Sequence, residues 1–259
     1  MIRLKTEREI DVIKESSLIV GKALAEVAKL IAPGVRCKTL DTVAEEYIRD
    51  NGAVPSFKGY NGFPATLCIS INDVVVHGIP GQQELKDGDI VSVDCGAKKN
   101  GFHADYAYTF FVGKVAEEIQ NLCNRTKESL YKGIEQAVVG NKIGDVSFAI
   151  QSYVEQFGYS VVREMIGHGV GRNLHEKPDV PNYGQKGSGP KIKKGMVFCI
   201  EPMINLGRKE IRIDRDGWTT RTIDGLPSAH FEHMVAIRET GTEVLSTYEY
   251  IYEVLKMNN

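Results

Sequence analysis

The pattern of apolar and polar positions predicts helices at the start of the chain. Thr6 and Glu9 have the spacing of a capping box, in which a hydroxyl and a carboxylate satisfy free amides at a helix start. Apolar residues then recur with helical spacing as far as Ile31, and Pro33-Gly34 ends the pattern. A second helical pattern runs from about Thr39 to Asp50. We therefore predict two helices before the first strand.

Strand patterns follow, and they alternate with further helices. Short apolar runs predict strands at residues 67–72, 74–76 and 89–93. Residues 90–113 predict a hairpin, because Asn100-Gly101 is a typical two-residue turn. Helical patterns return at about 116–139 and 145–157. Strand patterns come at 159–163, 196–201, 210–213, 218–222 and 230–237, and the tail at 248–252 alternates like one more strand.

The order of helices, strands, helices and strands favours an α+β fold. We expect two similar halves around one antiparallel sheet. No low-complexity tract or evident linker divides the chain, so we treat residues 1–259 as a single domain.

Composition narrows the class of protein. With 259 residues, 42% hydrophobic and 25% charged, the chain is an ordinary globular one. The net charge of −2 gives no reason to expect nucleic acid or an anionic membrane as the main partner. No apolar run approaches the ~20 residues of a membrane span, and the charged N-terminus is unlike a signal peptide. Five scattered cysteines without a CxxC pair are typical of free thiols, so we expect a cytoplasmic protein.

The predicted hairpin brings two carboxylates together. If Asn100-Gly101 is the turn, facing residues have numbers that sum to 201, so Asp105 faces Gly96. Asp94 shares that face, which places the two carboxylates on diagonal positions roughly 7–8 Å apart. Their apolar flanks indicate burial, and two buried carboxylates repel unless a proton or a cation lies between them. A simple exposed strand pair is the alternative.

Two further acids and a histidine extend the candidate site. Glu201 in MVFCIEP and Glu232 in AHFEHMVAI interrupt apolar runs, where an unpaired carboxylate is costly to desolvate. His168 lies in MIGHGVGRNLHEKP, whose glycines disfavour a helix and let other groups approach the backbone. For the acids, the simpler interpretation would be an ion pair with an arginine. For the histidine segment, it would be a flexible surface loop. Taken together, they favour a site for two divalent metals about 3.5–4 Å apart, as in a dinuclear hydrolase.

Six motifs carry a family resemblance. The chain resembles the type I methionine aminopeptidases in the order and spacing of these motifs: VVVHGIP (74–80), VSVDCG (91–96), GFHADYAYTF (101–110), GHGVGRNLHE (167–176), IEPMI (200–204) and HFEHM (230–234). The similarity extends from Ile2 to about Leu245. It implies the pita-bread fold, a pseudo-symmetric α+β domain with the site at the centre of its sheet. It also implies two divalent metal ions, which are cobalt, manganese, iron(II) or zinc, held by Asp94, Asp105, His168, Glu201 and Glu232.

The resemblance also implies roles for substrate-binding residues. Glu201 would move a proton to the leaving amine, His175 would donate to the oxyanion or the scissile amide, and His77 would orient the peptide beyond its first residue. The implied apolar pocket for a methionine side chain consists of Tyr60, Phe63, Cys68 and Trp218, although Cys68 also suits a plain core position.

Some residues depart from the pattern or have no implied role. Phe57 and Asn61 stand where some family members have Cys and His, which predicts a tighter or differently charged rim. For Phe57 itself we favour ordinary core packing. Three further histidines match no catalytic role, and we expect structural duties for His103, His230 and His233.

The implied reaction is removal of the initiator methionine from nascent chains whose second residue is small, by water activated between the metals. The implied partners are peptides with N-terminal methionine, nascent chains and, transiently, the ribosome, and we expect a monomer. Only 25 residues separate His175 from Glu201, which leaves no room for the helical insertion of type II enzymes. A prolidase or aminopeptidase P, which would carry an extra N-terminal domain, and a non-catalytic pita-bread binding protein remain alternatives.

Overall fold

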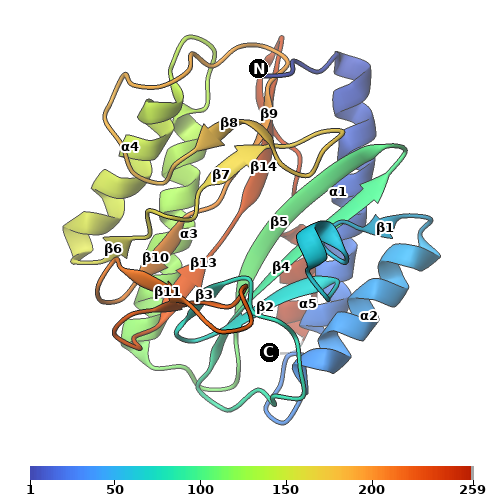
Figure 1. Ribbon diagram of the computed structural model, residues 1–259, viewed down its shortest axis with the longest axis vertical. Helices are drawn as coiled ribbons and strands as arrows, with labels where there is room; N and C mark the ends of the chain where they lie inside the picture. Colours follow the sequence, from blue (N-terminus) through green and yellow to red (C-terminus); the bar gives the residue numbers. More distant parts are fainter. Residues whose placement is uncertain (258–259) are drawn as a thin grey trace.

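Two pairs of helices flank the strands in the computed structural model, which describes residues 1–257. The helices are α1 (Glu7–Ala28), α2 (Cys37–Asp50), α3 (Glu117–Gln136), α4 (Ile143–Val154) and α5 (Glu249–Met257), with 3-10 turns η1 (Tyr60–Gly62) and η2 (Glu155–Phe157). Figure 1 shows α1 and α2 on one side of the strands and α3 and α4 on the other. Each half pairs a long helix, of 22 or 20 residues, with a shorter one, of 14 or 12 residues. The predicted similarity of the two halves is therefore visible in their helices.

Helix α1 begins at the predicted capping box. The Thr6 hydroxyl accepts the N–H of Glu9 at 3.2 Å, and the Glu9 carboxylate accepts the N–H of Thr6 at 3.0 Å. The helix then buries an apolar face that includes Ile10, Ile13 and Leu24. Because these contacts satisfy amides that no helical carbonyl can reach, they fix where the helix starts.

The strands form four hydrogen-bonded sheets, and every pair among the described residues is antiparallel. The first sheet contains β1 (Val54–Pro55), β4 (Ile90–Lys99), β2 (Leu67–Ile71) and β5 (Phe102–Phe111). The second contains β13 (Ser228–His230), β10 (Met203–Asn205) and β6 (Ser160–Val161). The other two are β11 (Ile211–Ile213), β12 (Thr220–Thr222) and β3 (Val74–Val76), and β15 (Gly241–Val244), β14 (His233–Arg238), β9 (Val197–Ile200), β7 (Gly167–Gly169) and β8 (Glu176–Val180).

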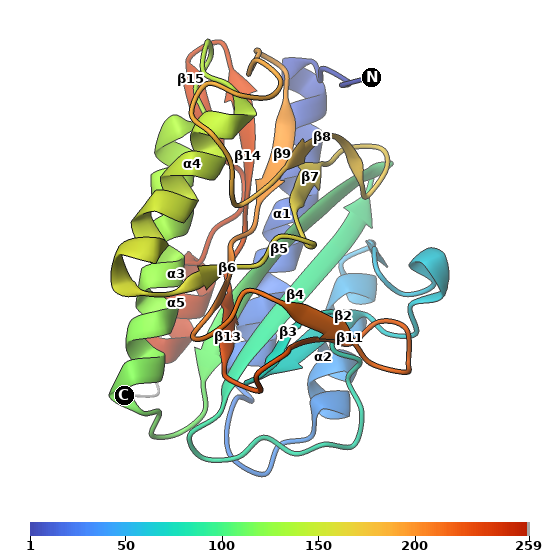
Figure 2. The same ribbon diagram turned by 60° about the vertical axis from the view of Figure 1, so that its left-hand side comes forward.

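The strands are antiparallel as expected, but they are divided among four hydrogen-bonded sheets instead of one, and the reason is local. Strand β9 stops before Glu201-Pro202, and Pro202 has no N–H with which to continue a ladder. The segment that pairs with β9 and β10 is interrupted at residues 231–232, between β13 and β14. These two interruptions separate the sheet that contains β9 and β14 from the sheet that contains β10 and β13. Figure 2 shows β9 and β14 above β13 in the same molecule. Each interruption carries one of the predicted acidic site residues.

The β4–β5 hairpin has the predicted register. Asn100 and Gly101 both have left-handed backbone angles, with φ of 51° and 84°, as a tight hairpin turn requires. Gly96 faces Asp105 and Asp94 faces Ala107, so facing numbers sum to 201 as predicted.

The strand predicted at residues 248–252 is wrong, because this segment starts helix α5. Ile251 is fully buried, and Tyr248, Tyr252 and Leu255 pack against the same core. Their spacing is that of one helical face. Alternating tyrosines over five residues fit a strand equally well, so the local pattern alone could not decide. None of the five helices in residues 1–257 is long and apolar enough to cross a membrane.

A buried ion pair ties the N-terminal segment to the loop that precedes β8. Lys5 Nζ lies 2.7 Å from Glu176 Oε2, and the two side chains are only 5% and 4% exposed. The other carboxylate oxygen of Glu176 accepts the N–H of Asn173 at 3.1 Å. Burial by itself would raise the pKa of Glu176, but the bonds from Lys5 and Asn173 lower it below its ordinary value.

Replacing Lys5 with methionine should be strongly destabilising, because it leaves the Glu176 carboxylate buried without its counter-charge. We expect Lys5→Met to lower the free energy of unfolding by about 3–5 kcal/mol. The matched control is Lys14→Met, which breaks an exposed ion pair of the same 2.7 Å length with Glu243 and should cost less than about 1 kcal/mol. Urea denaturation at pH 7 measures both. Equal losses would show that burial of the Lys5–Glu176 pair has no special effect.

Candidate metal centre and substrate pocket

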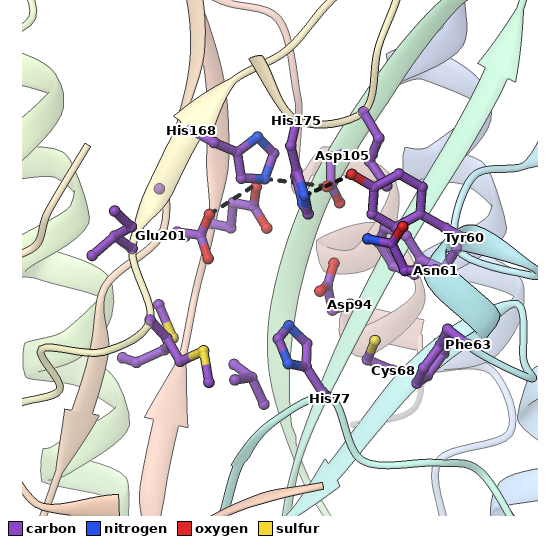
Figure 3. Close-up of a pocket in the computed structure, with 18 of the residues that line it drawn as sticks. Tyr60, Asn61, Phe63, Cys68, His77, Asp94, Asp105, His168, His175 and Glu201 are labelled. Carbon is purple, nitrogen blue, oxygen red and sulfur yellow. Dashed lines mark hydrogen bonds and ion pairs between the residues drawn. The ribbon is translucent and has the colours of Figure 1, made fainter. Parts of the chain in front are cut away.

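A cavity of about 550 Å³ lies where the strands of the two halves meet. Figure 3 shows side chains from several elements converging on it. All the predicted site residues line this one cavity, although they are spread over more than 170 positions of sequence: Tyr60, Phe63, Cys68, His77, Asp94, Asp105, His168, His175, Glu201, Trp218 and Glu232.

Four carboxylates line the cavity. The β4–β5 hairpin supplies Asp94 and Asp105, and the two sheet interruptions supply Glu201 and Glu232. Carboxylate oxygens of Asp94, Asp105 and Glu232 all lie within 4.8 Å of one another. Asp105 and Glu232 are 3% and 2% exposed, so almost no water reaches them.

Each of these acids has a buried oxygen without a hydrogen-bond partner among the described residues: Asp94 Oδ1, Asp105 Oδ1, Glu201 Oε1 and Glu232 Oε1. Burial raises the pKa of Asp94 to about 7. Burial, and then the negative charge of the neighbouring acids, raises the pKa values of Asp105, Glu201 and Glu232 well above their ordinary range. Four acids in this state repel one another whenever they ionise, unless a cation compensates the charge.

His168 adds one nitrogen to this oxygen-rich group. Its Nε2 atom lies 3.6 Å from Glu201 Oε1 and 3.8 Å from Asp105 Oδ2. Its Nδ1 atom lies 3.0 Å from the carbonyl oxygen of Gly169, to which an Nδ1–H donates. Burial and the nearby His175 lower the pKa of His168 to about 3, so the imidazole is neutral at pH 7. A neutral imidazole whose far nitrogen donates to a carbonyl directs its lone pair into the site, as metal-binding histidines commonly do.

The glycines beside His168 are required by close packing. A Cβ at Gly167 would lie 2.4 Å from the carbonyl oxygen of Cys199, and one at Gly169 would lie 2.4 Å from that of Lys177. Strand β7 therefore fits between β9 and β8 only because these residues lack side chains. This packing, and not flexibility, explains the glycine pattern in the sequence.

The residues fit a pair of divalent metal ions. Four carboxylates and one imidazole form a donor set that suits cobalt, manganese, iron(II) or zinc. The unpartnered buried oxygens are the observation that supports this fit, since the described residues offer them no proton donor.

Two further histidines, His77 and His175, line the same cavity as the carboxylates. His175 Nδ1 is 3.1 Å from the Tyr60 hydroxyl, and its ring centroid lies 4.1 Å from that of His168. His77 has a left-handed backbone with φ of 59°, an uncommon conformation that is frequent at functional sites. Burial lowers the pKa of His77 to about 4 and also lowers that of His175. Both rings are therefore neutral near pH 7 and can donate or accept hydrogen bonds.

An apolar cluster forms one wall of the cavity. Phe63 contacts Trp218 edge to face at 5.2 Å, and Cys68 is buried beside them. Phe57 belongs to this cluster but also lines the cavity, so ordinary core packing describes only part of its position. Asn61 lines the cavity as well. Sequence reasoning missed other lining residues that lie next to recognised motifs or within them: Val76, Met165, Ile166, Leu174 and Met203.

The remaining histidines lie outside the cavity lining. The His103 ring contacts the Ser56 hydroxyl at 2.8 Å. His233 contacts Ser246 at 2.6 Å. His230 is buried, and its Nε2 atom has no hydrogen-bond partner among the described residues.

Comparison with known proteins places this geometry in a family. The model of metallopeptidase family M24 matches residues 11–239. The methionine aminopeptidase of Clostridium perfringens is 52% identical over 246 residues, which cover 95% of this chain and 99% of that protein. The crystal structure of methionine aminopeptidase from Thermotoga maritima has a TM-score of 0.93 at 44% identity, with 95% and 100% covered. A prolidase from Pyrococcus furiosus has a TM-score of 0.78 at 25% identity, and the match covers 95% of this chain but only 66% of the prolidase.

The raised pKa values predict how pH affects the metal-free protein. An acid whose folded pKa lies above its unfolded value stabilises the fold below the unfolded pKa, and this stability is lost as pH rises through the folded pKa. The neutral buried histidines act in the opposite direction only below about pH 6.5. We therefore expect the melting temperature of metal-free protein to fall between pH 7 and 8.5. Added cobalt or manganese should raise it more at pH 8.5 than at pH 7, because fewer protons compete for the acids.

Differential scanning calorimetry of chelator-treated protein measures this effect. Asp94→Asn removes one of the repelling charges, so its melting temperature should depend less on pH over the same range. A metal-free wild-type protein equally stable at pH 7 and pH 8.5 would contradict this account of the four acids.

Proposed function

The chain belongs to metallopeptidase family M24, and we infer that it is a metal-dependent aminopeptidase that removes the N-terminal methionine of polypeptides. Its fold is the pita-bread fold of that family, in one domain. One observation carries the inference: four carboxylates, each with a buried oxygen that has no hydrogen-bond partner among the described residues, meet a neutral imidazole beside an apolar pocket. The prolidase alternative is disfavoured because the prolidase is only 25% identical to this chain, whereas a methionine aminopeptidase is 52% identical over almost its whole length. A non-catalytic binding protein would not need the complete set of metal-binding groups.

We propose that Asp94, Asp105, His168, Glu201 and Glu232 hold two divalent ions, and that residues 1–259 work as one catalytic domain. When bound, such ions supply Lewis acidity toward water and toward a peptide carbonyl. Glu201 lies beside His168 and lines the cavity, so its carboxylate is suited to moving a proton to the leaving amine.

The neutral histidines are proposed to contact the peptide. His175 would donate from its ring to the developing oxyanion or the scissile amide, while the Tyr60 hydroxyl holds the other ring nitrogen. His77 lies across the cavity against Trp218, at 6.3 Å between ring centroids, and would orient the peptide just beyond its first residue. The wall formed by Phe63, Cys68 and Trp218 would take the methionine side chain, whose thioether adapts to aromatic surroundings.

We also propose a cytoplasmic monomer that meets nascent chains through transient contact with the ribosome. The five buried free thiols support a reducing compartment. New polypeptide N-termini appear at the ribosome, which supports the contact. Cosedimentation with ribosomes and sedimentation velocity of the free protein test these two points.

The function is tested with three peptides. Met-Ala-Ser should be cleaved after methionine, whereas Met-Lys-Ser should be slow because His77 crowds a large second residue, and Leu-Ala-Ser should be poor because the pocket fits a thioether. Exhaustive chelation should abolish turnover, and added cobalt or manganese should restore it. Full activity in chelator, by protein shown to be free of metal, would refute the metallopeptidase assignment. Equal turnover of all three peptides would indicate a general aminopeptidase instead.

The two histidines of MIGHGVGRNLHEKP should respond differently to alanine substitution. His168→Ala should weaken metal binding, and excess metal should partly restore activity. His175→Ala should keep near-normal metal content but lose about 10²–10³-fold in kcat, because it removes a donor used mainly in the transition state. His103→Ala is the matched control, since that ring contacts Ser56 outside the cavity lining and should change neither quantity. Metal analysis and steady-state kinetics decide, and the reverse pattern would exchange the two assignments.

A further inference from the structure

The segment before α5 reaches back to the strands that carry Asp105 and Glu232. Tyr248 is 3% exposed, and its hydroxyl oxygen lies 2.7 Å from the carbonyl oxygen of Ala107 and 2.8 Å from that of Glu232. The same oxygen accepts the backbone N–H of Glu232 at 3.1 Å. Ala107 is two residues from Asp105 on β5. One buried hydroxyl therefore bridges the backbone beside Asp105 to the backbone of Glu232.

The tyrosine ring is itself held on several sides. It stacks on His233, with ring centroids 4.0 Å apart and planes inclined by 28°. The backbone of His233 is held by the pairing of β14 with β9, so the position of this ring does not depend on Ser246, whose hydroxyl contacts His233 Nδ1 at 2.6 Å and accepts the N–H of Met234 at 3.0 Å. Tyr108 packs against the tyrosine edge to face at 4.9 Å. These contacts leave the hydroxyl little freedom to move away from the two carbonyl groups.

The bridge lies where regular pairing is absent. Residues 231–232 fall between β13 and β14, so no strand ladder holds Glu232 from both sides. Apart from Tyr248, the backbone N–H of Glu232 has one bond, to the Ala107 carbonyl at 3.1 Å. A shift of this short connection would move the Glu232 carboxylate relative to Asp105, whose oxygens now lie within 4.8 Å of each other.

We infer that Tyr248 is a positioning residue for the metal centre: its hydroxyl sets the spacing between Asp105 and Glu232 by clamping the backbones that carry them. The inference rests on the proposed function, because it takes these two acids as metal ligands. Tyr248 lies beyond residue 239, where the match to the family model ends. The C-terminal segment thus completes the site from outside the matched region.

Metal titration of metal-free protein tests the inference. Tyr248→Phe removes only the hydroxyl, and we expect it to weaken binding of cobalt(II) by roughly 10-fold or more, a typical effect of losing a group that supports metal ligands. The visible absorption of bound cobalt(II) should also change, because the ligand geometry changes. Tyr250→Phe is the matched control: it removes a hydroxyl two residues away whose ring lies near Lys22 of α1, and it should titrate like the wild type.

A second variant separates positioning from general loosening. Ser246→Ala removes buried hydrogen bonds of the same segment but leaves the contacts of the Tyr248 hydroxyl in place. It should lower the melting temperature of the metal-free protein while keeping cobalt affinity within about twofold. If Tyr248→Phe and Ser246→Ala lose affinity in proportion to their losses of melting temperature, the effect is general and the inference is overturned.

The outcomes also separate this inference from the proposed function. If the wild-type protein takes up cobalt(II) and Tyr248→Phe titrates identically, the positioning role fails while the metal centre stands. If the wild-type protein takes up no divalent metal ion at all, the proposed function itself fails.

Discussion

Mutual repulsion among four buried or half-buried carboxylates is the constraint on which the rest of this structure depends. Left alone, such groups would separate or recruit water, because an ionised acid loses several kcal/mol of solvation when buried without a partner. The fold prevents both by placing each acid on a different part of a rigid scaffold. Protons can neutralise the group, as the raised pKa of Asp94 indicates, but a pair of cations does so without giving up the ionised form. Bound cations relieve the repulsion among the acids, and this relief favours metal binding.

The scaffold solves this problem with two different devices. Asp94 and Asp105 are fixed by the register of a single hairpin, which one tight turn determines. Glu201 and Glu232 stand at interruptions, where Pro202 and the 231–232 connection free the backbone from its ladder. The sheet is divided at the point where the chemistry is proposed to occur. Regular pairing holds one half of the acidic group, and side-chain contacts such as that of Tyr248 must hold the other.

This difference explains how much the sequence could predict. The hairpin acids followed from turn chemistry and a period of two, and acids inside apolar runs marked Glu201 and Glu232 without saying where they would meet. The family resemblance gathered the full set, and all of it lines one cavity. The division of the sheet depends on long-range strand pairing, which the local sequence does not show. The helix at the C-terminal end depends on packing against the core, which a pattern of five alternating residues cannot reveal. Likewise, Leu174 and Met203 reach the cavity only through tertiary contacts.

Both ends of the chain take part in holding the centre. Lys5 neutralises Glu176, the neighbour of His175, and Tyr248 grips the backbone of Glu232, although residues 11–239 suffice to match the family. These contacts join residues separated by 171 positions in the first case and 16 in the second. Chain ends are poorly ordered unless such contacts tie them down. The central strands supply the acids, and the chain ends keep the irregular segments around them from relaxing.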